Sequence, residues 1–193
     1  MEFKKIQITK QRTLNVVYKN GDGDIVTVTG GNLVHKDLRQ AMNALIPHLA
    51  IVTEQREAMG RNLKQVQGDR ITDEGNDSVF KRLDVDTVSF SDYEKEASVS
   101  GCRILLSGCV IKLSSPTVNL DDDEHYEYHD ELAADLEAVK YEAKQYLEEK
   151  KWGVKQAEIA FEDPFEGVTA DEVPIADVQQ PKKRGRKPKK NAA

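Results

Sequence analysis

The sequence has few of the features that mark membrane, secreted or disulfide-bonded proteins. It contains no run of about 18 apolar residues, and its first residues, Met1 to Lys5, lack the apolar segment of a signal peptide. Its two cysteines, Cys102 and Cys109, fit a reducing compartment and cannot alone form a zinc site, which needs about four ligands. These absences predict a soluble, cytoplasmic protein without a membrane partner.

The sequence also lacks the short motifs that accompany common kinds of catalysis. There is no Gly-x-Ser-x-Gly, no His-Glu-x-x-His and no glycine-rich phosphate loop ending in Lys-Ser/Thr. We therefore predict a protein that is not an enzyme, with no catalytic residue and no cofactor.

The densest polar cluster covers residues 121–130. His125 and His129 are four residues apart, so they would share a helix face, and acidic residues surround them. This pattern permits a divalent metal site. The alternative is a solvated loop that leads into a helix, whose N-terminus Asp130 and Glu131 would suit. We favour the loop and predict no metal.

Aromatic residues make up only 6% of the chain, against 32% charged residues. Platforms for stacking nucleic-acid bases are therefore scarce. Candidate rings on or near predicted strands are Phe3, Tyr18, Phe80, Phe90 and Tyr93. For Tyr18 and Phe90 a place in the core is the expected default.

The net charge of −6 is unevenly distributed. Residues 158–177 carry seven acids and no cation, and residues 182–190 carry seven cations, so these two stretches cancel. Residues 1–157 hold 21 cations and 27 acids. The body is therefore acidic, which argues against phosphate binding over its whole surface but permits a local basic face.

Alternation of polar and apolar residues predicts three strands in each half of the chain. The predicted strands cover 4–9, 14–18, 24–29, 86–90, 98–106 and 109–113, with a further extended piece to Leu120. Turn residues at 20–23 (Asn-Gly-Asp-Gly) and at Ser107-Gly108 separate the last two strands of each half. We therefore expect two β-hairpins.

An amphipathic helix is predicted after each set of strands, from about 35 to 59 and from about 130 to 150. Apolar residues recur at alternating steps of four and three: Leu38, Met42, Leu45, Leu49 and Val52 in the first helix, and Leu132, Leu136, Val139, Ala143 and Tyr146 in the second. Pro47 interrupts the first, so either the helix kinks there or two helices meet. Residues 60–84 are rich in Gly, Asp, Asn, Arg and Gln, which predicts a long loop.

A constant offset of 94 residues carries Leu38 onto Leu132 and His35 onto His129. Together with the shared order of elements, this predicts an α+β fold built from two duplicated antiparallel strand-strand-strand-helix units, packed as one pseudo-symmetric body. The alternative is that any two amphipathic helices align at this spacing. The predicted parts are units 1–59 and 85–155, the loop 60–84, an acidic disordered linker 156–180 and a basic tail 181–193.

The order of elements in each unit resembles that of Whirly and PUR-type proteins, whose repeats are antiparallel strands followed by a helix. The resemblance is one of topology. It implies that the body binds single-stranded nucleic acid. Fold does not fix function, and such repeats also occur in assembly proteins.

The basic tail, Pro-Lys-Lys-Arg-Gly-Arg-Lys-Pro-Lys-Lys at 181–190, resembles an AT-hook, a short element that lies in the minor groove of A·T-rich DNA. Arg184-Gly185-Arg186 matches the hook, whereas Lys187 intervenes before Pro188. The predicted DNA contacts are Lys182, Lys183, Arg184, Gly185, Arg186, Lys187, Lys189 and Lys190. The alternative is a solubilising tail or a nuclear-import-like patch.

Acidic residues around Phe165 resemble the acidic tip of bacterial single-stranded-DNA-binding proteins, in which acids precede Pro-Phe. The resemblance implies a possible protein partner for this segment. That tip ends its family's chains, whereas 28 residues follow Phe165 here. The alternative is an acidic linker, which would compete with DNA for the basic tail within one chain.

The sequence thus predicts a non-enzymatic DNA-binding protein, typical in style of a bacterial or phage product and therefore expected in a bacterial cell or a phage-infected host. The body would bind single-stranded nucleic acid or form homo-oligomers, and the tail would bind A·T-rich or non-specific DNA. The alternative is an interaction, assembly or sequestering protein with an incidental basic tail. An exposed apolar patch on the body would favour that alternative.

Overall fold

The computed structural model describes residues 1–72, 78–122 and 126–153. The contacts between residues divide the chain into two units, Met1–Lys155 and Gln156–Ala193. The predicted acidic linker, the segment around Phe165 and the basic tail lie outside the described residues. The helices and strands of the described residues all belong to the first unit.

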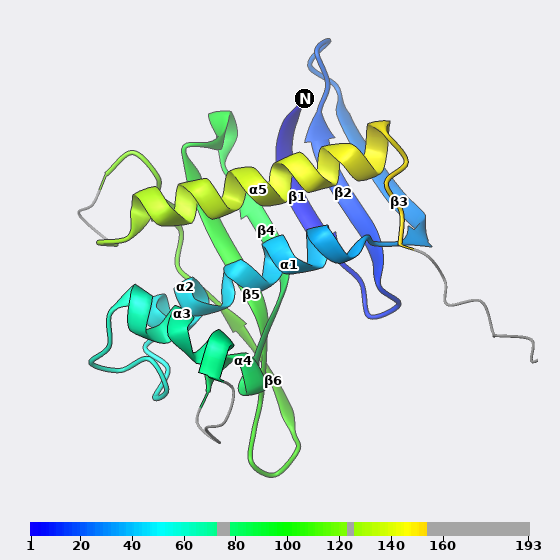
Figure 1. Ribbon diagram of the computed structural model, residues 1–193. Helices are drawn as coiled ribbons and strands as arrows, with labels where there is room; N and C mark the ends of the chain where they lie inside the picture. The colour runs from blue at the N-terminus through cyan, green and yellow to red at the C-terminus, as the bar shows by residue number, and fades with distance from the viewer. Residues whose placement is uncertain (73–77, 123–125, 154–193) are drawn as a thin grey trace, which may run out of the picture. The chain divides into compact units, whose positions relative to one another are not determined.

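A seven-stranded antiparallel sheet forms the framework of this unit (Figure 1). Its strands are β1 (Glu2–Ile8), β2 (Thr13–Lys19), β3 (Ile25–Leu33), β4 (Leu83–Phe90), β5 (Glu96–Ile104), β6 (Val110–Ser114) and β7 (Val118–Asn119). The order across the sheet is β3-β2-β1-β4-β5-β6, and β7 pairs with β5. The first half of the chain thus supplies one side of the sheet and the second half the other.

The helices are α1 (Lys36–Ala44), α2 (Ile46–Val52), α3 (Leu63–Thr72), α4 (Val79–Arg82) and α5 (His129–Glu148). The apolar stripes of the two predicted helical regions face the sheet. Helices α1 and α5 run side by side across one face of the sheet (Figure 1). All the stripe residues except Val52 are buried, and Val52 packs against the core. The predicted α+β class is therefore confirmed.

Both predicted hairpins are present because their turn residues accept the required backbone geometry. Gly23 has φ of 92° and Gly108 has φ of 81°, values that favour glycine. In the first turn, the side-chain oxygen of Asn20 accepts hydrogen bonds from the backbone N–H groups of Asp22 and Asp24. The turn fixes the register of β2 against β3.

The two halves meet at the pair of central strands β1 and β4. This ladder consists of three residue pairs, from Lys5–Ser89 to Gln7–Thr87. The helix of each half also contacts the central strand of the other half, since α1 contacts β4 and α5 contacts β1. The strand order is the same on both sides of this seam. The internal duplication itself stays a prediction.

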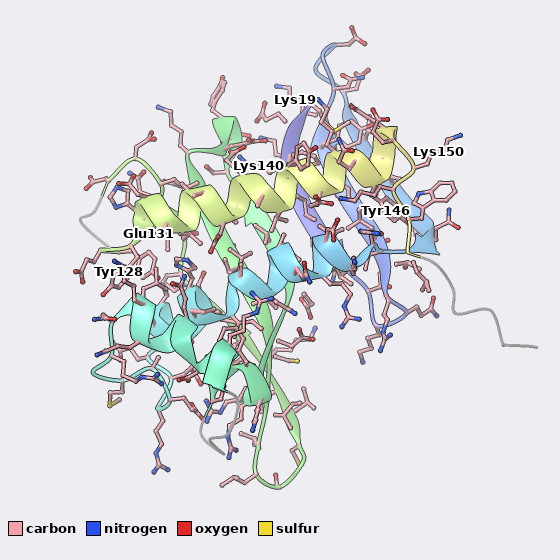
Figure 2. All side chains as sticks on the ribbon, viewed as in Figure 1. Lys19, Tyr128, Glu131, Lys140, Tyr146 and Lys150 are labelled. Atoms are coloured by element: carbon pink, nitrogen blue, oxygen red, sulfur yellow. The ribbon has the colours of Figure 1, made fainter. Side chains whose placement is uncertain are left out.

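Polar contacts tie α5 to its surroundings. Lys140 contacts Glu94 at 2.6 Å and Glu137 at 2.7 Å, and its ammonium group lies 4.9 Å from the centre of the Phe90 ring. Burial alone would lower the pKa of Lys140, but the two carboxylates hold it above its usual value. Tyr146, further along α5 (Figure 2), donates a hydrogen bond to the carbonyl oxygen of Asn32 at 2.6 Å.

The helical region around Pro47 is partly as predicted, and the loop predicted after it is wrong. Of the two structures left open at Pro47, two helices meet, α1 and α2, but the second ends at Val52 rather than at about residue 59. Pro47 lies in the first turn of α2, where its missing N–H costs no helical hydrogen bond. The loop predicted over 60–84 contains α3 and α4 and ends in β4. In α3, Leu63 and Val66 are buried, but the segment is mostly polar, and its apolar residues Leu63, Val66 and Ile71 are too few to form a clear helical stripe in the sequence.

Candidate nucleic-acid interface

The face of the sheet turned away from α1 and α5 is lined by polar residues and by Val17. Their neighbours along the strands, such as Ile6, Val16 and Val88, are buried in the core, so alternation points these residues the other way. One row across the sheet is Thr29, Asn15, Gln7, Thr87, Ser100 and Ser114, and the next is Thr27, Val17, Lys5, Ser89 and Ser98. We call these two rows the polar face.

None of the residues in the polar face is aromatic. Phe3 and Phe90 are buried in the core and Tyr18 packs against it, as expected by default for Tyr18 and Phe90. Phe80 lies on α4 beside Arg70, whose guanidinium carbon is 5.9 Å from the ring centre. Tyr93, in the 3₁₀-helix η1 (Asp92–Glu94), is 81% exposed. Base stacking on the two rows themselves is therefore excluded as a source of affinity.

A pocket of about 520 Å³ opens where β1 and β4 separate beyond their short ladder; we call it the interstrand pocket. The turn between β1 and β2, the central strands, β5, β6 and α1 all contribute to its wall. Its charged residues are the cations Lys10, Arg12, Arg39 and Lys112 and the carboxylates Asp84 and Asp86. The cations outnumber the acids two to one.

The acids of the interstrand pocket shift the titration of their neighbours. Asp84 keeps contact with solvent, yet desolvation raises the pKa of its carboxyl group. The attraction of Arg39 opposes this rise, and the repulsion from Asp86 adds to it. Burial, and then Asp84 and Asp86, raise the pKa of the Cys102 thiol. A nucleophilic cysteine needs the opposite shift, so Cys102 is placed to stay a neutral thiol.

A second pocket, also of about 520 Å³, is rich in arginine; we call it the arginine pocket. It is lined by Arg56, Glu57, Arg61, Arg82, Arg103, Leu105, Leu106 and Ser107. Glu57 binds Arg103 through two hydrogen bonds of 2.6 and 2.7 Å and lies 3.6 Å from Nε of Arg82. Burial alone would raise the pKa of Glu57, but the hydrogen bonds from Arg103 bring it below its usual value.

Arg61 is held in the arginine pocket by an acid just outside it. Its guanidinium group donates to both carboxylate oxygens of Asp69, at 2.6 and 3.0 Å, and to the carbonyl oxygens of Glu57 and Gln65. The bond to Arg61 lowers the pKa of Asp69. Arg61 thus connects α3 to the chain that follows α2.

We expect the stability contributed by Asp69 to disappear in acid. Because its folded-state pKa is lowered, ionised Asp69 stabilises the fold above its ordinary pKa of 3.8, and this stabilisation is lost as the pH falls through the folded-state value. Asp69→Asn should lower the free energy of unfolding by roughly 1.5–3 kcal/mol near neutral pH and by less below about pH 4. Urea unfolding of both proteins at the two pH values measures this, with Asp22→Asn in the exposed β2–β3 turn as control. An equal deficit at both pH values would contradict the assignment.

The β5–β6 hairpin stands between the two pockets. Arg103 and the turn residues 105–107 line the arginine pocket, whereas Cys102, Val110 and Lys112 line the interstrand pocket. Among the described residues, eight cations and three carboxylates line the two pockets together. The acidic body therefore carries a local concentration of positive charge around one hairpin.

Sequence patterns do not indicate these clusters. The four arginines of the arginine pocket are scattered between positions 56 and 103, and no local motif joins them. They meet because α4 and the end of β5 approach the chain that follows α2. Counting charges along the sequence shows only that the body has more acidic than basic residues.

His35 and His48 have structural partners. His48, which is 1% exposed, has its Nδ1 2.8 Å from the hydroxyl of Tyr126 and its Nε2 3.3 Å from a carboxylate oxygen of Asp135. Desolvation raises the pKa of Tyr126. His35 caps α1 by accepting a hydrogen bond from the N–H of Asp37. The sequence showed no partner for His48, because Tyr126 and Asp135 lie far along the chain.

His125 lies outside the described residues, and His129 lies at the start of α5, 3.4 Å from Asp130. Among the described residues, no three His, Cys, Asp or Glu side chains are grouped so that they could hold a metal ion. Within the same part of the chain, no helix has the length and apolar character to cross a membrane. The predicted DNA contacts Lys182 to Lys190 are not part of the described structure.

No family model, curated protein or solved structure matches this chain. The likeness to Whirly and PUR-type proteins and the likeness of the tail to an AT-hook therefore stay predictions.

Proposed function

We propose that the protein is a non-enzymatic binder of single-stranded nucleic acid. The observation that carries this proposal concerns two pockets on either side of the β5–β6 hairpin, on a body that is acidic overall: the described residues that line them include eight cations and three carboxylates. Concentrated Arg and Lys side chains in concave sites suit phosphate groups, which dominate the affinity of nucleic-acid binding. The basic tail adds contacts to A·T-rich or non-specific DNA.

The polar face favours a single strand as the ligand. Thr87 is buried and the side-chain oxygen of Asn15 is closed to solvent, but the other Ser, Thr and Gln side chains of the polar face keep contact with solvent. Their hydroxyl and amide groups suit hydrogen bonds with base edges that a duplex keeps paired. Because the two rows contain no aromatic ring, affinity there rests on hydrogen bonds and phosphate contacts. Such binding tolerates many sequences and weakens strongly with salt.

We expect a double variant of the interstrand pocket, Arg12→Gln with Lys112→Gln, to weaken binding of a single-stranded oligonucleotide. Loss of two phosphate contacts should make the slope of log affinity against log salt less steep by about 1.4, at about 0.7 for each contact on a single strand. Fluorescence anisotropy over a series of salt concentrations, with single-stranded and duplex oligonucleotides, measures both effects.

The matched control is Lys144→Gln with Lys150→Gln, which removes two exposed charges from the end of α5 and from just after it. This control changes the net charge equally but should leave the slope within about 0.3 of the wild-type value, since neither lysine is among the residues that line the arginine pocket or the interstrand pocket. Equal slopes for the two double variants would mean that the interstrand pocket does not contact the strand. Preference for the duplex would contradict the single-strand proposal.

The second candidate function is self-association or assembly with a protein partner. It is favoured by apolar side chains exposed on the β5–β6 hairpin: Leu106 at 88%, Val110 at 62%, Ile104 at 45% and Ile111 at 42%. Sedimentation across a range of protein concentrations without nucleic acid separates the two functions. A stable oligomer that binds no oligonucleotide would replace the first proposal with this one.

A further inference from the structure

We propose that the interstrand pocket selects a base that carries an exocyclic amino group, with Asp84 accepting from the amine and Arg39 donating to an acceptor beside it. This deepens the proposed function and rests on it. The volume of the pocket, about 520 Å³, lies within the range of small-molecule sites, about 300 to 1,000 Å³. A base turned out of a single strand can therefore enter it.

Two carboxylates of the interstrand pocket have no role in phosphate binding. Asp84 and Asp86 repel phosphate groups, so a site built only for the backbone of a strand would be better without them. An ionised carboxylate accepts hydrogen bonds and donates none. The donors along a single strand of DNA are the N–H groups of its bases. The two acids therefore suit a base edge, while the cations of the pocket suit the phosphates.

Asp84 and Arg39 line this pocket without binding each other. They attract each other, yet no hydrogen bond or ion pair joins their side chains in the described part of the chain. Arg39 lies on α1 and Asp84 on β4, and these two elements pack together, so the fold fixes the separation of the two groups. The backbone N–H of Val85 holds the Asp84 carboxylate, which keeps lone pairs for further donors. The pocket thus offers an acceptor and a donor to one ligand.

Cytosine and guanine each present a donor and an acceptor side by side. Cytosine has its N4 amine beside the acceptors N3 and O2, and guanine has N1–H and the N2 amine beside the acceptor O6. A carboxylate commonly accepts from the cytosine amine, and arginine commonly donates to guanine. Thymine has no amine, and carbonyl oxygens on both sides of its N3–H repel a carboxylate. A pocket with one acceptor and one donor group therefore disfavours thymine.

Other residues of the interstrand pocket suit the rest of a nucleotide. Ile8 and Met42, from β1 and α1, offer apolar surface to the face of a base. Lys10, Arg12 and Lys112 are exposed, and within the part of the chain that the structure describes their side chains make no hydrogen bond or ion pair. These three cations can therefore bind the phosphates on either side of the base.

The test measures, by fluorescence anisotropy, binding of thymidine strands that carry one test base at the centre. Each test base is paired with a counterpart that lacks its amino group: cytosine with uracil, guanine with hypoxanthine, and adenine with purine. We expect the full-length protein to bind the cytosine or the guanine strand roughly tenfold more tightly than its counterpart, the effect of a charge-assisted hydrogen bond. The basic tail meets the same phosphates in both strands of a pair, so the ratio of affinities reports on the pocket.

Three variants separate recognition of the amine from general electrostatics. Asp84→Ala should lose most of the preference, yet bind an all-thymidine strand at least as tightly as the wild type does, because a repulsive charge is gone. Arg39→Ala should also lose the preference, but it should bind every strand more weakly. Asp22→Ala, in the exposed β2–β3 turn, removes a carboxylate outside the pocket and should keep the preference. Circular dichroism confirms that each variant is folded.

Equal affinity within all three pairs for the full-length protein overturns base selection. A preference that survives in Asp84→Ala overturns it as well, since the amine then binds elsewhere. If strands bind in either case, the proposed function stands without this site. If no strand binds at all, the proposed function fails, and base selection fails with it.

Discussion

Deletion of residues 181–193 should lower the affinity for DNA and flatten its dependence on salt more than any change in the body. The segment carries seven cations, and loss of seven phosphate contacts removes about 5 from the slope of log affinity against log salt on a single strand. Between about 50 and 200 mM salt, the full-length protein should lose on the order of a thousandfold in affinity that the truncated protein does not lose. Anisotropy titrations of both proteins over this range give the two slopes.

Two full-length variants separate the effect of the tail's charge from the effect of its arginine side chains in the minor groove. Replacement of its seven cations by glutamine should reproduce the deletion, because release of counterions depends on the number of charges. Arg184→Lys with Arg186→Lys keeps the charge and should keep the slope. It should reduce any preference for A·T-rich duplex, since arginine is favoured in a narrow minor groove. A truncated protein with unchanged affinity and slope would show that the tail does not bind DNA.

Gly101→Ala should be among the most destabilising small substitutions in the body. Gly101 faces the bulge of β4 where the register shifts between Val85 and Thr87, and an added Cβ would overlap the carbonyl oxygen and carbon of Asp84. Backbone atoms of a paired strand cannot move aside as a flexible side chain can. We expect a loss of roughly 3 kcal/mol in the free energy of unfolding, at the upper end of overpacking costs, measured by urea unfolding.

Gly31→Ala is the matched control, because a Cβ on Gly31 meets no atom within 4 Å. It should change stability by no more than about 0.5 kcal/mol. Asp84 lies in the interstrand pocket, so a surviving fraction of folded Gly101→Ala should also bind nucleic acid more weakly than the control does. Equal stability of the two alanine variants would mean that β4 and β5 are further apart at this point than described.

Elements whose signal is local could be predicted from the sequence. The hairpin turns have Gly at positions of positive φ, and Leu132 to Tyr146 repeat at helical spacing, so the hairpins and α5 were expected close to where they lie. At Pro47 the sequence left two structures open, a kinked helix or two helices, because proline disfavours a helix interior but suits a first turn; the structure has two helices, α1 and α2. α3 was missed because its few apolar residues, Leu63, Val66 and Ile71, lie on a mostly polar segment.

The candidate site could not be predicted from local sequence patterns, for a different reason. The arginine pocket joins residues 56, 61, 82 and 103, and the interstrand pocket joins the β1–β2 turn to β6. Such groupings depend on strand order and register, which pairwise spacing along the chain does not encode. The same holds for His48, whose partner Tyr126 follows it by 78 residues. The charge totals show that the body is acidic overall, but they do not show where its cations lie close together.

The crossed packing at the seam makes the body a single cooperative unit. Since α1 contacts β4 and α5 contacts β1, neither half covers its own apolar surface when separated from the other. The ladder of three residue pairs between β1 and β4 is too short to join two independent domains, so the helix layer and the sheet must form together. Unfolding of the body should therefore be one transition, and a ligand bound beside the seam stabilises both halves at once.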